Sequence, residues 1–256
     1  AVTGATNITL SGELDAATGD FSGAVDVAGT TTAVAITASG LITANADMLI
    51  GGTTPTLTIG DAGAEDTKIV FDGNAQDFYI GLDDTDDSIK IGLGSTLGTT
   101  AHIVSNAAGI VTMPLQPLFK VQQTGALSVA DGHNLFSTEL TEAYDVNADV
   151  GTNGQFTAPV DGYYQFSFTV LYKDMGTGGA DDSVEDQFVS SNLTETGARW
   201  GKLDDAILVD AYGQSHATTI LFMDASDTCK IVHTNGGTMA VHNTATNSHF
   251  EGHLLQ

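Results

Sequence analysis

Residues 156–168 read FTAPVDGYYQFSF and carry the clearest structural signal in the chain. Gly162 follows a proline-containing segment and suits a turn, because glycine adopts backbone conformations that other residues avoid. Tyr164, Phe166 and Phe168 then come at alternate positions. Alternate residues of a β-strand point to one side of the sheet, so these rings are expected to fill the core of a β-sandwich. The segment therefore predicts a long, half-buried strand directly after the glycine.

Further short strands are expected throughout the C-terminal half, with Gly, Asn or Asp turn signals between them. No segment there has a convincing helical period. Many short strands joined by such turns predict a sandwich or jelly roll, so the expected fold class is all-β. The expected strands are 118–122, 134–140, 154–158, 162–172, 186–194, 206–212, 215–223, 228–234, 238–242 and 249–255.

The N-terminal half is acidic and loosely repetitive. Short alternating runs that close with glycine recur, for example at 57–60, 78–81 and 88–94. Each run offers only a few inward side chains, too few to bury a core within one chain. We expect a repetitive β-rich stalk in which three chains intertwine, with small apolar residues at the axis. For residues 1–55 a flexible low-complexity linker is the alternative.

Two prolines mark the boundary between the halves. Pro114 and Pro117 stand too close together for a central strand, because proline cannot donate to the hydrogen-bond ladder. The predicted domains are an N-terminal Gly/Ala/Thr-rich stalk at 1–55, a patterned β stalk at 56–113, a linker at 114–118 and a head domain at 119–256.

The C-terminal half resembles the C1q-like (C1q/TNF-type) head domains. Their signature asks for Phe, five residues, Gly, and then aromatics at alternate positions. A closing strand with Ser-x-Phe-x-Gly-x-Leu-Leu is matched at 248–255. The positions that carry the resemblance are Phe156, Gly162, Tyr164, Phe166, Phe168, Phe250 and Gly252, with Phe119 as the first-strand Phe and Tyr144-Asp145 as the family's Tyr-Asp.

This resemblance covers residues 119–256 and implies a ten-stranded jelly roll that forms a tight trimer. The chain departs from the family at Asp149, where an aromatic residue or leucine is usual. The departure predicts that the 145–154 loop is built differently from that of the family.

A second resemblance concerns the stalk. Residues 70–84 and 92–100 look like stalk segments of marine bacteriophage fibre proteins, and so does the pattern at 10–15 and 25–29. Animal C1q proteins usually carry a collagen stalk, but this chain has no Gly-X-Y run. The resemblance implies a fibre of a phage or of a bacterial surface.

Charge and hydropathy argue against two classes of partner. The net charge is −25, from 32 acidic residues against 7 Lys and Arg. Nucleic acid is not an expected partner, because phosphates require a basic surface. Membrane insertion is not expected either, because no apolar stretch approaches the length of a span. Cys229 is the sole cysteine and is expected to be a small buried hydrophobe.

No catalytic constellation is visible. The sequence has no phosphate loop and no dinucleotide motif, and residues 213–217 lack the second glycine of a nucleophile elbow. We therefore predict that the chain is not an enzyme and has no cofactor.

Metal sites are the alternatives at two kinds of segment. Ca²⁺ could bind the acidic turn at 83–87 or the alternating Asp145, Asn147 and Asp149, although ordinary solvated turns are favoured. A trimer could also bring copies of one histidine together at its axis, although ordinary strand positions are favoured. The histidines in question are His216, His233, His242, His249 and His253.

Two features are candidates for contacts with a receptor. Residues 181–186 follow a glycine-rich stretch and are interpreted as an exposed loop. Trp200 could stack on a sugar, although a lone tryptophan is more often partly buried.

These observations lead to one principal hypothesis. The chain is a homotrimeric viral (phage) fibre or appendage protein, located on the virion or the extracellular surface, whose head mediates attachment to the host. Expected partners are further copies of itself, a host cell-surface receptor with a glycan as one candidate, and other virion proteins. A purely structural virion decoration or connector, and a bacterial secreted adhesin or filament subunit, are the alternatives.

Overall fold

The computed structural model describes residues 37–38, 41–138, 140–173, 183–201, 212–235, 238–242 and 246–255. Over these residues the chain forms strands β1 to β17 and no helix, so none of them lies in a helix that could span a membrane. The chain divides into two compact units, 1–57 and 58–256. Several predictions lie outside the described residues: most of the 1–55 stalk, most of the strand at 206–212, and Asp181 and Asp182 of the acidic loop.

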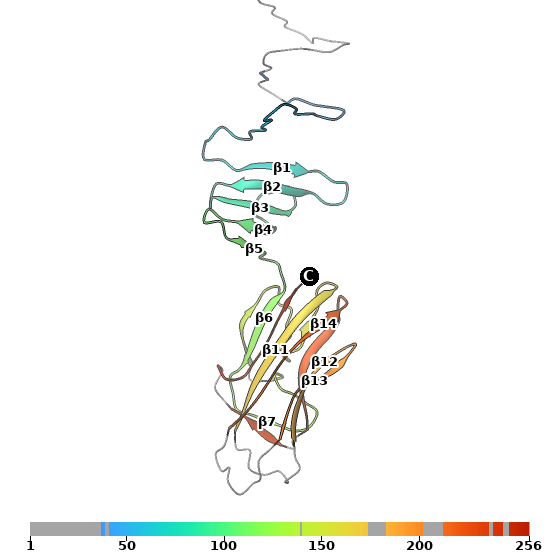
Figure 1. The fold of residues 1–256 in the computed structure, drawn as a ribbon. Helices are drawn as coiled ribbons and strands as arrows, with labels where there is room; N and C mark the ends of the chain where they lie inside the picture. Colours follow the sequence, from blue (N-terminus) through green and yellow to red (C-terminus); the bar gives the residue numbers. More distant parts are fainter. Residues whose placement is uncertain are drawn as a thin grey trace, which may run out of the picture. The chain divides into compact units, whose positions relative to one another are not determined.

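The first sheet is a five-stranded antiparallel meander in the order β1-β2-β3-β4-β5 (Figure 1). Polar turns connect its strands; in the β2–β3 turn, Asp87 has a φ of 53°, which aspartate tolerates better than most residues. Alternation along β2 and β3 separates two faces, as a period of two requires. The strands are β1 Thr67–Phe71, β2 Phe78–Asp83, β3 Ser88–Leu93, β4 Ala101–Ser105 and β5 Val111–Thr112.

The remaining strands form the two sheets of the head. The larger sheet has the order β7-β16-β11-β17-β6-β9, with β14 also paired to β11. The smaller sheet has the order β10-β15-β12-β13, with β8 also paired to β15. Figure 1 labels β6, β7, β11 and β14 of the larger sheet and β12 and β13 of the smaller. The strands are β6 Leu118–Gln123, β7 Leu127–Val129, β8 His133–Asn134, β9 Leu140–Asp145, β10 Phe156–Thr157, β11 Gly162–Lys173, β12 Ser183–Ser190, β13 Thr194–Gly201, β14 Gly213–Met223, β15 Thr228–Asn235, β16 Met239–Val241 and β17 His249–Leu254.

One aromatic core holds these two sheets together. Phe119 stacks on Phe156 with ring centroids 5.0 Å apart, and Phe250 meets the Phe119 ring edge-on at the same distance. Phe168 of β11 contacts Phe188 of β12 across the sandwich at 5.0 Å. The all-β class and the jelly-roll sandwich are thus confirmed. The stalk, its trimer and the domain boundaries stay predictions.

The predicted strand at 134–140 is wrong. After β8 the chain turns, and both Leu135 and Phe136 are buried in the core. Consecutive residues of a strand point to opposite faces, so a regular strand could not bury both against one core. The Leu135 N–H donates instead to the Ile231 carbonyl of β15 at 2.9 Å. Within the described part of the head, strands β7, β9 and β13 were not predicted.

Candidate functional site

The sequence motif builds the inner face of the larger head sheet. Tyr164, Phe166 and Phe168 all point inward from β11 and are buried. Phe168 pairs with Phe250 of β17, and Phe166 pairs with Gly252. The remaining motif residues frame this face: Phe156 is buried on β10, and Gly162 opens β11.

Gly252 is required by close packing. A Cβ atom at this position would lie 2.6 Å from Phe166 Cδ1 and 2.8 Å from Phe119 Cε1. Carbon atoms in contact normally stay about 3.5–4.0 Å apart, so only glycine fits between these rings.

The residues between the motif positions form the opposite face of the same sheet, which we call the open sheet face. It consists of the outward side chains of four neighbouring strands, and the strand register places them in transverse rows. The rows are Phe222–Tyr163, Ile220–Gln165–His253–Leu118, Thr218–Ser167–Glu251–Lys120 and His216–Thr169–His249–Gln122.

One end of the open sheet face is apolar. Phe222 and Tyr163 contact each other edge-to-face at 5.2 Å, yet 51% and 46% of their surfaces remain exposed. Ile220 of the next row is 56% exposed, and Leu118 and Tyr144 are also exposed. Large apolar groups that gather in this way on one sheet commonly mark an interaction surface.

The centre of the open sheet face is polar but internally neutralised. Lys120 Nζ lies 2.9 Å from Glu251 Oε2, and the Ser167 hydroxyl donates to Glu251 Oε1 at 3.0 Å. Burial alone would raise the pKa of Glu251, but the hydrogen bonds from Lys120 and Ser167 outweigh it and lower the pKa. Glu251 is therefore held as a carboxylate whose charge is compensated within the chain.

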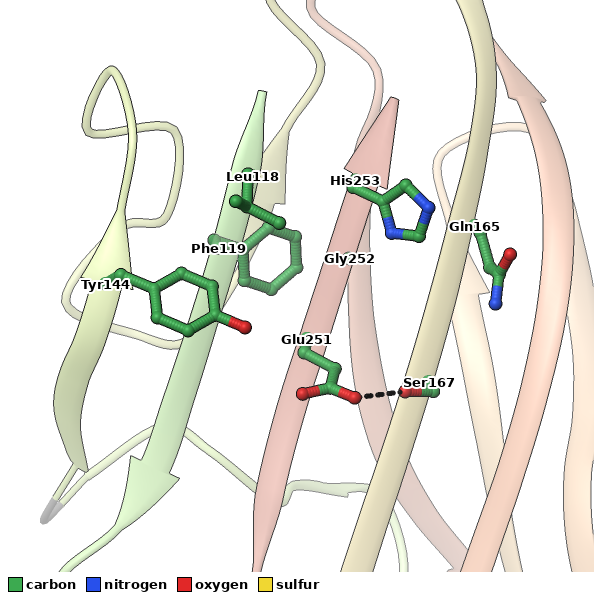
Figure 2. Close-up of a pocket in the computed structure, with 8 residues that line it drawn as sticks. All are labelled: Leu118, Phe119, Tyr144, Gln165, Ser167, Glu251, Gly252 and His253. Carbon is green, nitrogen blue, oxygen red and sulfur yellow. Dashed lines mark hydrogen bonds between the residues drawn. The ribbon is translucent and has the colours of Figure 1, made fainter. Parts of the chain in front are cut away.

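A small pocket of about 150 Å³ opens at this centre, above Gly252 (Figure 2). Ser167 bonds directly to the Glu251 carboxylate, with no histidine between them to act as a general base. These two residues thus lack the arrangement of an activated nucleophile. Its lining consists of Leu118, Phe119, Tyr144, Gln165, Ser167, Glu251, Gly252 and His253.

The five C-terminal histidines do not form one cluster. His216, His249 and His253 lie on the open sheet face, whereas His233 is fully buried in the core. Burial, and then the nearby charge of Lys120, lowers the pKa of His249, and the opposing charge of Glu251 is the weaker effect. Among the described residues, no group of three or more His, Cys, Asp or Glu side chains could hold a metal ion.

The remaining predicted histidine, His242, follows β16 and meets the Tyr212 ring edge-on at 5.4 Å. It therefore lies outside the rows of the open sheet face.

A lysine from the following strand, Lys90 of β3, forms ion pairs with the acidic turn at 83–87. Lys90 Nζ lies 2.6 Å from Asp83 Oδ2 and 2.8 Å from Asp86 Oδ2. Hydrogen bonds from Lys90 are the main cause that lowers the pKa of both aspartates, and the same bonds raise the pKa of Lys90. An ammonium group thus occupies the position where Ca²⁺ was the alternative.

The second acidic segment is also engaged within the chain. The Asp145 carboxylate accepts the backbone N–H groups of Asp149 at 3.0 Å and Val150 at 2.9 Å. Asn147 Nδ2 donates to the Leu115 carbonyl at 3.1 Å. Burial, followed by the charge of Asp145, raises the pKa of Asp149. These bonds shape the 145–154 loop.

The interpretation of 181–186 as an exposed loop is wrong for its described part. β12 begins at Ser183, and Asp186 is fully buried. Val184, Asp186 and Phe188 alternate inward along this strand, so the aspartate occupies a core position. Trp200 lies on β13, and its side chain is outside the described part of the structure.

A buried polar network was not predicted from the sequence. The Tyr172 hydroxyl of β11 donates to Asp186 Oδ1 of β12 at 2.8 Å, and His233 Nδ1 of β15 lies 2.9 Å from the same oxygen. Burial, and then the charge of Asp186, raises the pKa of Tyr172 well above its usual 10.0. The network links the two sheets of the head. Its one sequence signal was the inward alternation of β11, which places Tyr172 in line with Phe168.

Comparisons with known proteins give fold-level similarity only. No protein-family model matches the chain, and no curated protein sequence matches it. The solved structure of Eiger TNF from S. frugiperda is 14% identical, with a TM-score of 0.43 over 55% of this chain and 94% of that chain. The globular domain of zebrafish complement 1qA protein is 15% identical, with a TM-score of 0.39 over 55% of this chain and 98% of that chain.

The structure of murine APRIL at pH 8.5 is 10% identical, with a TM-score of 0.40 over 55% of this chain and 99% of that chain. No family is assigned on these values. The jelly-roll description rests on the strands, the register and the core described above.

Proposed function

We propose that this chain is a homotrimeric fibre or appendage protein, of the phage tail-fibre class, whose head attaches the particle to a host cell surface. It would lie on the outside of the virion. The observation that carries the proposal is the open sheet face of the head, which leaves large apolar side chains exposed on a chain with a net charge of −25.

The chemistry of the open sheet face favours a further copy of the chain as its partner. Phe222, Tyr163 and Ile220 offer an apolar contact at one end. The Lys120–Glu251 pair cancels its own charge at the centre, so identical faces can approach without like-charge repulsion there. Three copies related by a rotation axis could each bury this face against the others.

Attachment follows from presenting three identical heads together. Weak contacts of each head with a surface receptor, a glycan among the candidates, add up to stable adhesion because the second and third contacts become intramolecular. Contacts with other virion proteins would anchor the opposite end. A passive connector or decoration would share the trimer but bind no cell, and a secreted bacterial adhesin would bind cells without a virion.

The test combines mass and adhesion on the full chain. We expect light scattering to give about three times the chain mass of 26.3 kDa, and fluorescently labelled trimer to bind cells of a susceptible host. Phe222→Lys should break the contact between heads, seen as a lower mass or as faster proteolysis of the heads. It should weaken adhesion at least about tenfold, because the three heads are no longer held together for joint binding. Leu193→Lys is the control, because Leu193 is also exposed but lies in the turn between β12 and β13.

A monomeric wild-type chain would refute the proposal. A trimer that binds no cell in a broad panel of bacteria would refute attachment and favour the passive connector.

A further inference from the structure

A row of four isoleucines crosses the β1–β5 sheet. Ile69 of β1 pairs with Ile80, Ile80 pairs with Ile91, and Ile91 pairs with Ile103 of β4. Apolar side chains flank the row on both sides, and we call the whole set the isoleucine face. It consists of Ile69, Phe71, Phe78, Ile80, Leu82, Ile89, Ile91, Leu93 and Ile103, with no charged residue among them.

The opposite face of this sheet is closed by the chain itself. Tyr79 is buried there, and its hydroxyl accepts the Gly98 N–H at 3.1 Å. A Cβ atom at Gly92 would lie 2.3 Å from the same hydroxyl oxygen, so the 94–100 segment packs tightly over the sheet. Lys90, held by two aspartates, completes this face. Within the described residues, the sheet therefore packs on one side only.

The isoleucine face stays open in the described part of the chain. Phe71 is 60% exposed, and Phe78, Ile69, Leu82, Ile89 and Ile91 each leave more than a third of their surface to solvent. Together these six side chains expose on the order of 500 Å² of apolar surface, as much as the largest patch on a typical monomer. A shallow hollow of about 240 Å³ lies on the same face, lined by Ile59, Ile69, Ile80, Leu82 and Ile89 among others.

We propose that the same face of two further copies of this chain covers the isoleucine face, so that three β1–β5 sheets enclose a common apolar core. This inference rests on the proposed trimer but concerns a surface separate from the head. It also replaces the predicted small apolar residues at the stalk axis with large ones, chiefly isoleucine and phenylalanine.

Charge argues that the occupant is another copy of the chain. Residues 61–90 carry nine acidic residues and two lysines, so two copies repel each other almost everywhere around this sheet. The isoleucine face has no charge to repel, and apolar contact needs no complementary charge. It is the one surface of the described sheet on which identical acidic copies can meet closely.

Folding argues for the same occupant. A single sheet with one open apolar face gains too little burial to stay ordered, so its cover must be present whenever the chain folds. Further copies of the same chain meet this requirement, because they are made together. Two such faces would bury about 1,000 Å² in total, which is near the lower bound for a specific interface and below the roughly 800 Å² per partner of a standard one.

The test measures protection of introduced thiols in the full chain. Ile91 and Val70 are both β-branched and both 36% exposed in the single chain, but they lie on opposite faces of the sheet. In the native assembly, the Ile91→Cys thiol should react with iodoacetamide at least tenfold more slowly than the Val70→Cys thiol, and the two rates should become equal in urea. Cys229 is buried, so wild-type protein supplies the background rate.

The mass of the full chain in solution shows whether further copies of the chain cover the isoleucine face. We expect Ile91→Asp to lower the mass of the full chain in light scattering or to expose the stalk to protease, while Val70→Asp does neither. Equal thiol rates in the native assembly would overturn the inference even if the heads associate and bind cells. Protection of the Ile91→Cys thiol in a monomeric chain would also overturn it, because the cover would then be another segment of the same chain.

Discussion

Replacing Gly252 by alanine adds one methyl group at the most crowded point of the head core. The new Cβ would lie 2.6 and 2.9 Å from Cδ1 and Cε1 of Phe166, and 2.8 Å from Cε1 of Phe119. Both rings would have to retreat by about 1 Å to reach an ordinary contact distance. Neither ring can move freely. The ring centroids of Phe119 and Phe156 are stacked 5.0 Å apart, and those of Phe166 and Phe250 are 5.9 Å apart.

The expected cost follows from these contacts. Overpacking by one methyl group in a close-packed core costs about 1–3 kcal/mol. Alanine recovers roughly 0.5–1 kcal/mol, because it restricts the unfolded chain more than glycine does. The difference spans about 0–2.5 kcal/mol. Because the new Cβ would make three contacts under 3.0 Å, we expect Gly252→Ala to lie in the upper part of this range and to lower the free energy of unfolding by about 1–2 kcal/mol, and the melting temperature by about 3–8 °C for a domain of this size.

Urea denaturation of the full chain, followed by near-UV circular dichroism of the head aromatics, measures this change. Phe166→Leu makes room beside position 252, so the double variant should lose less stability than the sum of the two single variants. A loss below about 0.5 kcal/mol for Gly252→Ala, or additive costs in the double variant, would refute this account of the core.

Three further predictions concern titratable groups. The head should lose stability as the pH falls below 6.5. The pKa of His249 is lowered in the folded state, so the folded state binds this proton more weakly than the unfolded chain does. The His249→Asn variant should therefore show a smaller drop in the urea midpoint between pH 8 and pH 5 than wild-type protein. Tyr172→Phe should lower the free energy of unfolding by about 1–3 kcal/mol, because it removes a hydrogen-bond donor from the buried Asp186 side chain. Tyr163→Phe on the open sheet face should lower it by less than about 0.5 kcal/mol. Equal losses for the two variants would contradict the buried network. Lys90→Met should speed hydrogen exchange of the backbone amides in β2 and β3 several-fold, because it removes the ion pair with Asp83. Wild-type amides in these strands should lose the same protection in acid, as the pH falls through the lowered pKa of Asp83, below 3.8.

Local pattern was sufficient for the elements that have a long alternating run. β11 and β14 were predicted nearly to their ends, because one side of each strand faces a continuous core and the period of two shows in the sequence. β15 was also predicted nearly to its ends, although Ile231, Val232 and His233 are all buried and do not alternate. The motif residues lie in the core for the same reason.

Local pattern failed where neighbours in space decide burial. Leu135 and Phe136 look like part of a strand but turn into the core one after the other. Asp186 looks like part of an acidic loop, but its partners Tyr172 and His233 come from distant positions in the chain. No local signal shows that an aspartate will meet a buried tyrosine and histidine, so its burial was not predictable.

The sequence by itself determined the all-β class, the positions of most head strands along the chain and the identity of the motif aromatics that fill the sandwich, because alternation and turn residues act within a few positions of the chain. Only the tertiary structure decided which faces stay open. The rows of the open sheet face and of the isoleucine face depend on strand register, which sets side by side residues that lie many positions apart in the sequence. Whether an outward apolar residue stands alone or joins a surface that needs a partner is therefore a property of the pairing between strands, and not of any one strand.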